Sequence, residues 1–268
     1  MKTVTATHFI MWQGYSMSIV KDIQVRTITS KVANEFVRKH HYSGKVVPNS
    51  QLHFGAFLNG VLHGVMSFGA SMDKRKIQGL VADTGWNDFI ELNRMAFDDK
   101  LPKNSESRCI AVALRIIKKK APNIKWVVSF ADATQCGDGT IYRASGFVLT
   151  GIKPNKQILN WNGNLIAKKT LDNKNYPKID GKYYSRYLLE TGEATPLDGW
   201  QLRYIYFIDK TYRSKLTVPE LDYSVIDDNN AKMYKGMRQQ SKSKTAGFHS
   251  AKGGAVPTLT HQFNKNLI

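Results

Sequence analysis

The segment from Ser129 to Gly151, SFADATQCGDGTIYRASGFVLTG, constrains the fold of this chain more than any other. An apolar run from Trp126 to Phe130 ends in Ala131-Asp132, which predicts a buried central strand with a carboxylate at its C-terminal end. Open α/β sheets bind ligands at the edge where their strands end. Asp132 is therefore a candidate functional residue.

A short helix and a returning strand are predicted after that carboxylate. Asp138 is placed to cap a helix that runs from Ile141 to Ser145. Gly146 supplies the left-handed stop of this helix, and the chain resumes as a strand at Phe147. Tyr142 then lies in the middle of the helix, beside the end of the preceding strand.

Hydrophobic periodicity predicts the other elements of a mixed α/β domain. We expect strands at residues 22–29, 52–58, 61–68, 89–97 and 201–209, and helices at residues 32–40 and 105–120. The dipeptide Asn59-Gly60 predicts a type I′ hairpin turn, because both residues tolerate positive φ angles. Apolar residues recur at i, i+3, i+4 and i+7 from Ile110, which indicates an amphipathic helix that ends before Pro122.

Composition divides the chain into three expected parts. Met17 offers a second start, so residues 1–16 are expected to be an N-terminal extension. Residues 17–210 carry the periodic elements and form the predicted catalytic domain. Residues 211–268 form a C-terminal extension, of which 231–268 hold seven Lys or Arg and no Asp or Glu. This composition is typical of a disordered basic tail.

The charge balance favours a polyanionic partner. The 39 Lys and Arg residues against 21 Asp and Glu give a formal net charge of +18. Nucleic acid is one such partner, although ribosome-associated and heparin-binding proteins share this balance. There is no apolar run of 18 residues and no secretory signal in the first 15 residues. Cys109 and Cys136 show no metal-type spacing, so we expect free thiols, no membrane association and a cytoplasmic location.

Three segments together carry a family resemblance. They are HHYSGKVVPNS (His40–Ser50), ELNRMAFDDKLPKNSESR (Glu91–Arg108) and FADATQCGDGTIYRASGFVLTG (Phe130–Gly151). The last is similar to the C-terminal half of the GNAT acyltransferase fold, and all three resemble the Mom family of phage DNA-modification proteins, over roughly residues 22–210. The resemblance implies a GNAT-like mixed central sheet flanked by helices. It also implies an enzyme that converts adenine in DNA to N6-carbamoylmethyladenine and so protects phage DNA from host restriction.

The same resemblance places the functional residues. It maps catalytic roles onto His41, Tyr42, Asp132 and Tyr142, and in GNAT enzymes a tyrosine on the corresponding helix protonates a departing CoA thiolate. It further implies iron, for which His41, Tyr42 and Asp132 are an acceptable ligand set. The alternative for the His-Tyr pair is ordinary packing at a helix end.

Donor binding is expected at the start of the helix over residues 105–120. GNAT enzymes hold the CoA pyrophosphate at this position, where free backbone N–H groups form an anion cradle. The candidates here are Asn104, Ser105, Ser107 and Arg108, but no glycine occurs between residues 98 and 108, and an ordinary capped helix is an equal alternative. A carbamoylmethyl group attaches through a CH2, which simple acyl transfer from acetyl-CoA cannot produce, so the choice between acetyl-CoA and another donor stays open.

The implied reaction sets requirements for DNA recognition. The N6 amine of adenine is a weak nucleophile and needs a general base, for which Asp132 is the candidate. Within double-stranded DNA the base must flip out, and Tyr42, Trp86 and Phe97 are candidates to hold it. The cationic candidates for DNA contact are Lys74, Arg75, Lys76, Arg94, Lys232, Lys235, Arg238, Lys242 and Lys244. Arg94 with its neighbour Asn93 also fits a buried polar pair.

Two other functions remain as alternatives. An ordinary GNAT N-acetyltransferase that acts on a small amine or a protein predicts a glycine-rich loop, which is absent, and leaves the charge of +18 unexplained. A non-catalytic DNA-binding protein explains the charge but leaves the Asp, Tyr and His residues unexplained. The sequence carries no signal for oligomeric state.

Overall fold

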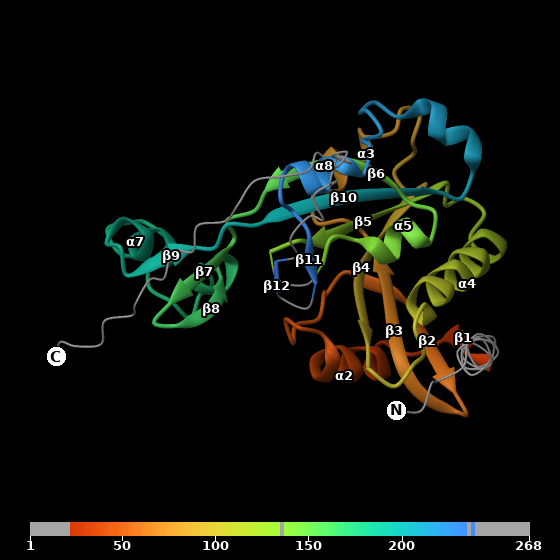
Figure 1. Cartoon of the computed structure of the whole chain (residues 1–268), viewed down its shortest axis with the longest axis horizontal. Coiled ribbons are helices and arrows are strands. Elements are labelled where there is room, and N and C mark those ends of the chain that lie inside the picture. Colours follow the sequence, from red (N-terminus) through yellow and green to blue (C-terminus); the bar gives the residue numbers. More distant parts are fainter. Residues whose placement is uncertain (1–21, 135–136, 235–236, 239–268) are drawn as a thin grey trace, which may run out of the picture.

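A computed structural model describes residues 22–134, 137–234 and 237–238 of the chain (Figure 1). Its centre is a seven-stranded mixed sheet in the order β1-β2-β3-β4-β5-β10-β6. The bounds of these strands are Gln24–Thr27 (β1), Ser50–Leu58 (β2), Val61–Gly69 (β3), Phe89–Phe97 (β4), Trp126–Asp132 (β5), Val148–Pro154 (β6) and Trp200–Phe207 (β10). Strands β4 and β5 run parallel, while the other neighbouring pairs of this sheet run antiparallel. The predicted mixed sheet is thereby confirmed.

The hairpin of β2 and β3 forms where the sequence predicts it. Asn59 and Gly60 have φ angles of 52° and 78°, as a type I′ turn requires. Leu58 pairs with Val61 directly across the turn. The backbone twist of a type I′ turn matches the twist of the two strands, so they pair from the turn onward. Both strands are nine residues long.

Helices cover both faces of the sheet. Helix α2 (Ser30–His40) lies on one face, where its Ala33 and Val37 pack against Val65 and Ala96. Helices α4 (Ser105–Lys120) and α5 (Thr140–Ala144) lie on the other face, over the larger core. The apolar stripe predicted for α4 is buried in that core, at Ile110, Ala113, Leu114 and Ile117. None of the helices in the described part of the chain could span a membrane.

The parallel pair β4 and β5 separates before either strand ends. Its register runs from Phe89 opposite Trp126 to Leu92 opposite Ser129 and stops there, although β4 continues to Phe97. A bulge follows on β4, since Arg94 and Leu92 oppose consecutive residues of β3. The C-terminal parts of both strands therefore carry side chains beyond the last shared hydrogen bonds.

A second, smaller unit lies between β6 and β10, which we call the insertion (residues 155–199). It contains a sheet in the order β8-β7-β9, with β7 at Ile158–Trp161, β8 at Asn164–Ala167 and β9 at Ala194–Pro196. Two helices complete it, α6 at Lys168–Leu171 and α7 at Tyr184–Glu190. Figure 1 shows it projecting from one end of the central sheet. The sequence shows only a polar, Asn-rich stretch here, and the elements of this unit were not predicted.

The insertion has its own core. Leu159, Leu171 and Leu188 are fully buried within it. Around them, the rings of Tyr176 and Tyr184 stack at 5.4 Å between centroids, and Trp161 meets the latter edge-on. These aromatic side chains are explained by packing.

The chain after β10 also packs against the central sheet. It forms η1 (Lys210–Lys215), α8 (Ser224–Asp228), β11 (Met233–Tyr234) and β12 (Met237–Arg238), of which β11 and β12 pair with each other. Ile226 and Ala231 are buried in the larger core, so the prediction of a disordered tail from residue 231 onward is wrong at its start. Core formation by these apolar residues outweighs the basic composition. Residues 239–268 lie outside the described part of the chain.

Candidate functional site

A tyrosine and a carboxylate from distant parts of the chain meet at the end of β5. The hydroxyl of Tyr42, just after α2, donates a hydrogen bond to Oδ2 of Asp132 at 3.4 Å. The other carboxylate oxygen, Oδ1, accepts from the backbone N–H of Thr134 at 3.0 Å and from Nδ2 of Asn155 at 3.4 Å. These contacts fix the orientation of the carboxylate and direct one oxygen toward the phenol.

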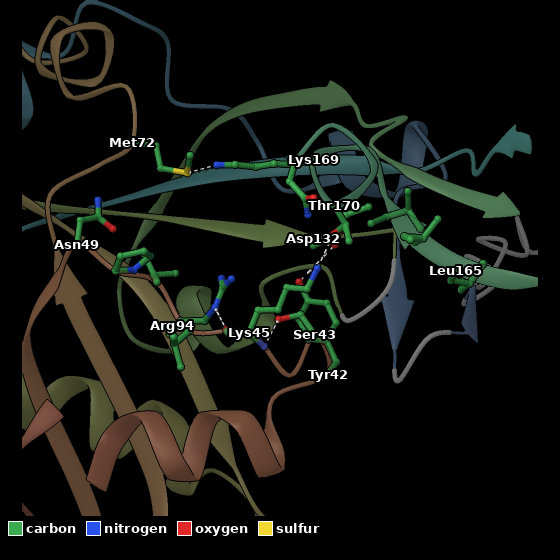
Figure 2. A pocket seen from close by; sticks show the side chains of 17 residues that line it. Tyr42, Ser43, Lys45, Asn49, Met72, Arg94, Asp132, Leu165, Lys169 and Thr170 are labelled. Atoms are coloured by element: carbon green, nitrogen blue, oxygen red, sulfur yellow. Dashed lines mark hydrogen bonds between the residues drawn. The ribbon is translucent and has the colours of Figure 1, made fainter. Parts of the chain in front are cut away.

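This pair lies in the wall of a cavity of about 770 Å³ (Figure 2). Three regions line it: the segment after α2 that includes Tyr42 and Lys45, the ends of β4 and β5 with Arg94 and Asp132, and the insertion. The cavity therefore opens where β4 and β5 separate, and the insertion supplies its remaining wall.

Cations outnumber carboxylates among the charged residues of the cavity wall. Lys45, Arg94 and Lys169 line the cavity together with one carboxylate, that of Asp132. Nε of Arg94 donates to the backbone oxygen of Lys45 at 2.9 Å, and Nη1 donates to that of Asn93 at 3.1 Å. The guanidinium is thus held against the segment after α2, with its charge at the cavity.

Contacts between the insertion and the central domain cross the cavity. Nζ of Lys45 donates a hydrogen bond to Oγ1 of Thr170, on α6. Nζ of Lys169 donates to Sδ of Met72 at 3.8 Å, within the range for a sulfur acceptor. Both lysines are exposed, so these contacts leave charge available at the mouth of the cavity.

His41 lies behind Tyr42 and does not belong to the cavity wall. Its Nδ1 accepts from the backbone N–H of Ser43 at 3.2 Å and lies 2.8 Å from the Ser43 hydroxyl, which places the ring proton on Nε2. Burial and the nearby charge of Arg94 lower the pKa of His41 to about 4 from its ordinary 6.5. The imidazole is neutral at neutral pH, and its ring packs 4.4 Å from that of Tyr42. His41 thus packs against the ring of Tyr42 without lining the cavity.

Tyr142 is also outside the cavity wall. Its side chain is 8% exposed and lies in the core beneath α5. The ring centroids of Phe147 and Tyr204 are 5.5 Å and 5.4 Å from its own. The structure therefore brings Tyr42 and Asp132 together, as predicted, and places Tyr142 within an aromatic cluster. A proton-transfer role for Tyr142 stays a prediction.

The proposed iron ligands do not form a complete metal site. Tyr42 and Asp132 meet, but Nδ1 of His41 already accepts a hydrogen bond from Ser43. Within the described residues, no group of three or more His, Cys, Asp and Glu side chains is arranged to hold a metal ion. That finding does not count tyrosine, so an iron-binding role for His41, Tyr42 and Asp132 stays a prediction.

At the start of α4, the predicted donor site, two serine hydroxyls donate hydrogen bonds to nearby backbone oxygens. Ser105 is fully buried, and its hydroxyl donates to the backbone oxygen of Pro102 at 2.5 Å. The Ser107 hydroxyl donates to the backbone oxygen of Asn104 at 3.2 Å. Asn104 takes a left-handed conformation, and Arg108 is half-buried on the first turn. A role for these four residues in binding CoA stays a prediction.

The basic segment after Asp73, for which the polar run Asp73–Lys76 predicts an exposed loop, is instead a short helix, α3 (Lys74–Gln78). Asp73 accepts from the backbone N–H of Lys76 at 3.4 Å, and such capping favours the first helical turn. Nζ of Lys74 lies 4.6 Å from the ring centroid of Trp86, whose side chain is 52% exposed. Lys74, Arg75 and Lys76 thus form a basic surface with an aromatic neighbour.

The other DNA-binding and base-holding candidates are dispersed. Lys232 forms an ion pair of 3.5 Å with Asp227, and the backbone of Arg238 belongs to β12. Phe97 is half-buried against the larger core and does not line the cavity. Lys235, Lys242 and Lys244 lie outside the described residues.

The cavity residues of the insertion were missed from the sequence. They include Leu165, Lys169 and Thr170. One signal was present, because Asn162-Gly163 repeats the turn dipeptide of the first hairpin and adopts φ angles of 50° and 78°. That dipeptide predicts the β7-β8 hairpin, although it does not predict which site the hairpin reaches.

Known proteins resemble this chain at two levels. It is 39% identical over 132 residues to the methylcarbamoylase Mom of Escherichia phage Mu, an alignment that covers 49% of this chain and 54% of that protein. The chain thus spans about half the length of this curated relative.

Solved acetyltransferases show a more general likeness. A Bacillus subtilis acetyltransferase in complex with CoA has a TM-score of 0.40 at 10% identity, over 69% of this chain and 98% of that one. The ribosomal-protein-S18-alanine N-acetyltransferase of Escherichia coli has a TM-score of 0.39 at 10% identity, over 69% and 94%. At these scores nothing about the chemistry of this chain follows from the likeness.

Family membership rests on a broader match. The model of the Mom protein family matches residues 22–225, which include the central sheet, the site at the end of β5 and the insertion. The chain belongs to the Mom protein family.

Proposed function

We propose that this protein is a DNA-modifying transferase that converts adenine in double-stranded DNA to N6-carbamoylmethyladenine and so protects phage DNA from restriction. The observation that carries the proposal is the Tyr42–Asp132 pair in the wall of a cation-rich cavity. Membership of the Mom family and the name of the phage Mu relative support it. The reaction would take place in the cytoplasm of the host cell, where phage DNA is found.

Asp132 is the proposed general base. The lone pair of the N6 amine is delocalised into the adenine ring, so a proton must leave as the new bond forms. That proton passes to Asp132, the amine nitrogen bonds to the CH2 carbon of an activated carbamoylmethyl donor, and the leaving group departs with the bonding electrons. Hydrogen bonds from Thr134 and Asn155 hold Oδ1, which leaves Oδ2 and the Tyr42 hydroxyl to face the amine.

The cavity has the size and lining for a flipped base. Ligand cavities commonly measure roughly 300–1,000 Å³, and this one measures about 770 Å³. The Tyr42 side chain is 53% exposed and offers an aromatic face, which flipped bases commonly contact. Arg94, Lys45 and Lys169 supply positive charge for phosphate groups of the DNA or of the donor.

The donor stays open in this proposal. The start of α4, with Asn104, Ser105, Ser107 and Arg108, is its proposed phosphate site if the donor is a CoA derivative. Acetyl-CoA itself delivers an acetyl group through its carbonyl carbon, so acetyl transfer alone cannot form the N–CH2 bond of the product.

Mass spectrometry of nucleosides tests the proposal directly. DNA from cells that express the protein is digested and searched for a deoxyadenosine that carries the mass of one carbamoylmethyl group. The same DNA is expected to resist several restriction enzymes. Unmodified deoxyadenosine in cells that contain soluble protein and a co-infecting phage, which supplies any accessory factor, would overturn it.

A further inference from the structure

Six of the seven cations of the insertion fall into two groups, and the seventh, Lys178, lies 4.7 Å from the ring centroid of Tyr183. The first group is paired with carboxylates of the same unit. Lys156 lies 3.6 Å from Asp198, and Lys182 and Arg186 lie 2.7 Å and 2.9 Å from Glu190. Two carboxylates offset most of the charge of these three cations, so the group contributes less to the field of the insertion at longer range than three unpaired cations would.

The second group has no such compensation. Lys168, Lys169 and Lys174 form no ion pair with any carboxylate in the described part of the chain. They belong to α6 and the segment that follows it, and Lys169 lines the cavity. Residues 168–174 hold these three cations and one carboxylate, Asp172, so the segment keeps a net positive charge that attracts a polyanion.

Apolar side chains accompany these cations at the cavity. Met72 on the central domain and Leu165 on β8 both line it, with exposed fractions of 75% and 55%. Figure 2 shows Lys169 extending to Met72, while Leu165 lies farther away on the other side of the view. Exposed apolar groups beside cations suit a ligand that has both bases and phosphates, because proteins that deform DNA place such side chains against its bases.

The central domain presents cations on the opposite side of the cavity. Lys45 and Arg94 line that side, and α3 adds Lys74 and its basic neighbours just beyond Met72. A polyanion in contact with both sides would pass directly over Asp132. Double-stranded DNA has this form, since its two strands carry phosphates on both sides of each base pair.

We propose that the insertion is the DNA clamp of this protein. Lys168, Lys169 and Lys174 bind backbone phosphates of a duplex that lies across the cavity mouth, so that the target adenine reaches Tyr42 and Asp132. This inference rests on the proposed function and extends it, because it assigns the recognition of the duplex to a unit outside the central sheet.

Two triple variants of the full-length protein test the clamp. The test variant carries Lys168→Gln, Lys169→Gln and Lys174→Gln. The matched control replaces the three ion-paired cations of the same unit, Lys156, Lys182 and Arg186, each with Gln. Both variants lose three positive charges from the insertion, but only the control breaks ion pairs, and the side chains of those pairs are exposed. The melting temperature of each variant, compared with that of the wild-type protein, shows whether it folds.

Affinity for a short DNA duplex is then measured at several salt concentrations. Each phosphate that the protein no longer binds lowers the magnitude of the slope of log K against log salt concentration by about 0.9, so the slope of the test variant is expected to fall by up to about 2.7. The control is expected to keep the wild-type slope. The level of modified deoxyadenosine in cells is expected to fall for the test variant and to persist for the control.

The outcomes separate the clamp from the proposed function. A test variant with the wild-type slope, or an equal fall of slope in both triple variants, overturns the clamp. If wild-type protein modifies DNA while the test variant keeps its slope, the clamp fails and the function stands. If wild-type protein neither binds the duplex nor modifies DNA, both fail. A slope change with single-stranded RNA but none with duplex DNA also overturns the clamp.

Discussion

The hydroxyl of Tyr42 and the carboxylate of Asp132 are 90 residues apart in the sequence and 3.4 Å apart in the structure. The contact joins the end of α2 to the end of β5, on the face of the sheet that the insertion also reaches. It brings a proton acceptor and a phenol to one position in the cavity wall. Most of the expected effects of mutation follow from this contact.

Asp132→Asn is expected to reduce DNA modification by a factor of about 100 or more, because positioned general bases contribute on that order. The amide oxygen can still accept from the Thr134 N–H, so the turn after β5 should persist. Nucleoside mass spectrometry and the melting temperature are the two measurements. Asp222→Asn is the matched control, because Asp222 accepts from the backbone N–H of Ser224 in the same local geometry. Near-normal modification by a folded Asp132→Asn protein would show that the assignment of the base is wrong.

Tyr42→Phe removes the hydroxyl that faces Asp132 and keeps the aromatic face. Modification is expected to fall about tenfold, while the affinity for duplex DNA changes little. Tyr42→Ala should reduce both. Tyr183→Phe is the control, since its side chain is also 53% exposed but it lies at the start of α7. Equal activity of Tyr42→Phe and wild-type protein would limit the role of Tyr42 to stacking.

Tyr142 tests whether a buried phenol takes part in the chemistry. Tyr142→Phe keeps the packing against Phe147 and Tyr204, so the melting temperature should stay close to that of wild type while modification falls. Tyr142→Ala should instead destabilise the fold by about 3–5 kcal/mol, as other deletions of large buried rings do. Full modification by Tyr142→Phe would show that the ring serves the core alone.

His41 is expected to make stability depend on pH. The pKa of His41 is lowered to about 4 in the folded state, whereas the ordinary value is 6.5. The unfolded chain therefore binds a proton first as pH falls, and the stabilisation that is complete above pH 6.5 is lost between 6.5 and about 4. At pH 5 this loss is on the order of 2 kcal/mol.

Urea unfolding at pH 7 and pH 5 measures this loss. The His41→Gln protein provides the comparison, because it lacks the titrating ring while all other groups titrate as before. The fall in unfolding free energy between the two pH values should be smaller for the variant than for wild type. Equal falls would show that His41 titrates alike in the folded and unfolded states.

Two truncations separate the basic terminus from the core. Removal of residues 239–268 takes away four lysines and is expected to leave the melting temperature unchanged. It should lower the salt slope of DNA binding by about 0.9 for each phosphate that these lysines neutralise. Removal of residues 231–268 also deletes the buried Ala231 and the β11-β12 pair, and should lower the melting temperature. Equal melting temperatures for the two truncations would contradict the packing of Ala231.

The sequence predicts those parts of the fold that local patterns determine. Asn59-Gly60 specifies its hairpin because few other residues adopt both required φ angles, and α4 follows from an apolar repeat that one core face buries. Asp132 follows in the same way, as the last residue of an apolar strand. These features depend on residues within a few positions of each other.

The rest of the site depends on long-range packing. The sequence places Tyr142 on a helix, but only the packing of that helix against Phe147 turns the ring into the core. It likewise gives no indication that the hydrophobic residues spread through the polar insertion form a separate core, or that Lys169 reaches across to Met72. Position along the chain does not determine on which face of the sheet a helix packs.

The two ends of the insertion leave the central sheet side by side. Pro154 at the end of β6 pairs with Trp200 at the start of β10, and the backbone N–H of Asn155 donates to the oxygen of Gly199 at 2.7 Å. The 45 residues of the insertion therefore connect two adjacent antiparallel strands, as the loop of a hairpin does. Lengthening such a loop carries only a small entropic cost. The insertion can therefore be replaced by a loop of another length and shape while β5 and its carboxylate stay unchanged. Under the clamp proposal, such a replacement would change which form of nucleic acid the protein binds.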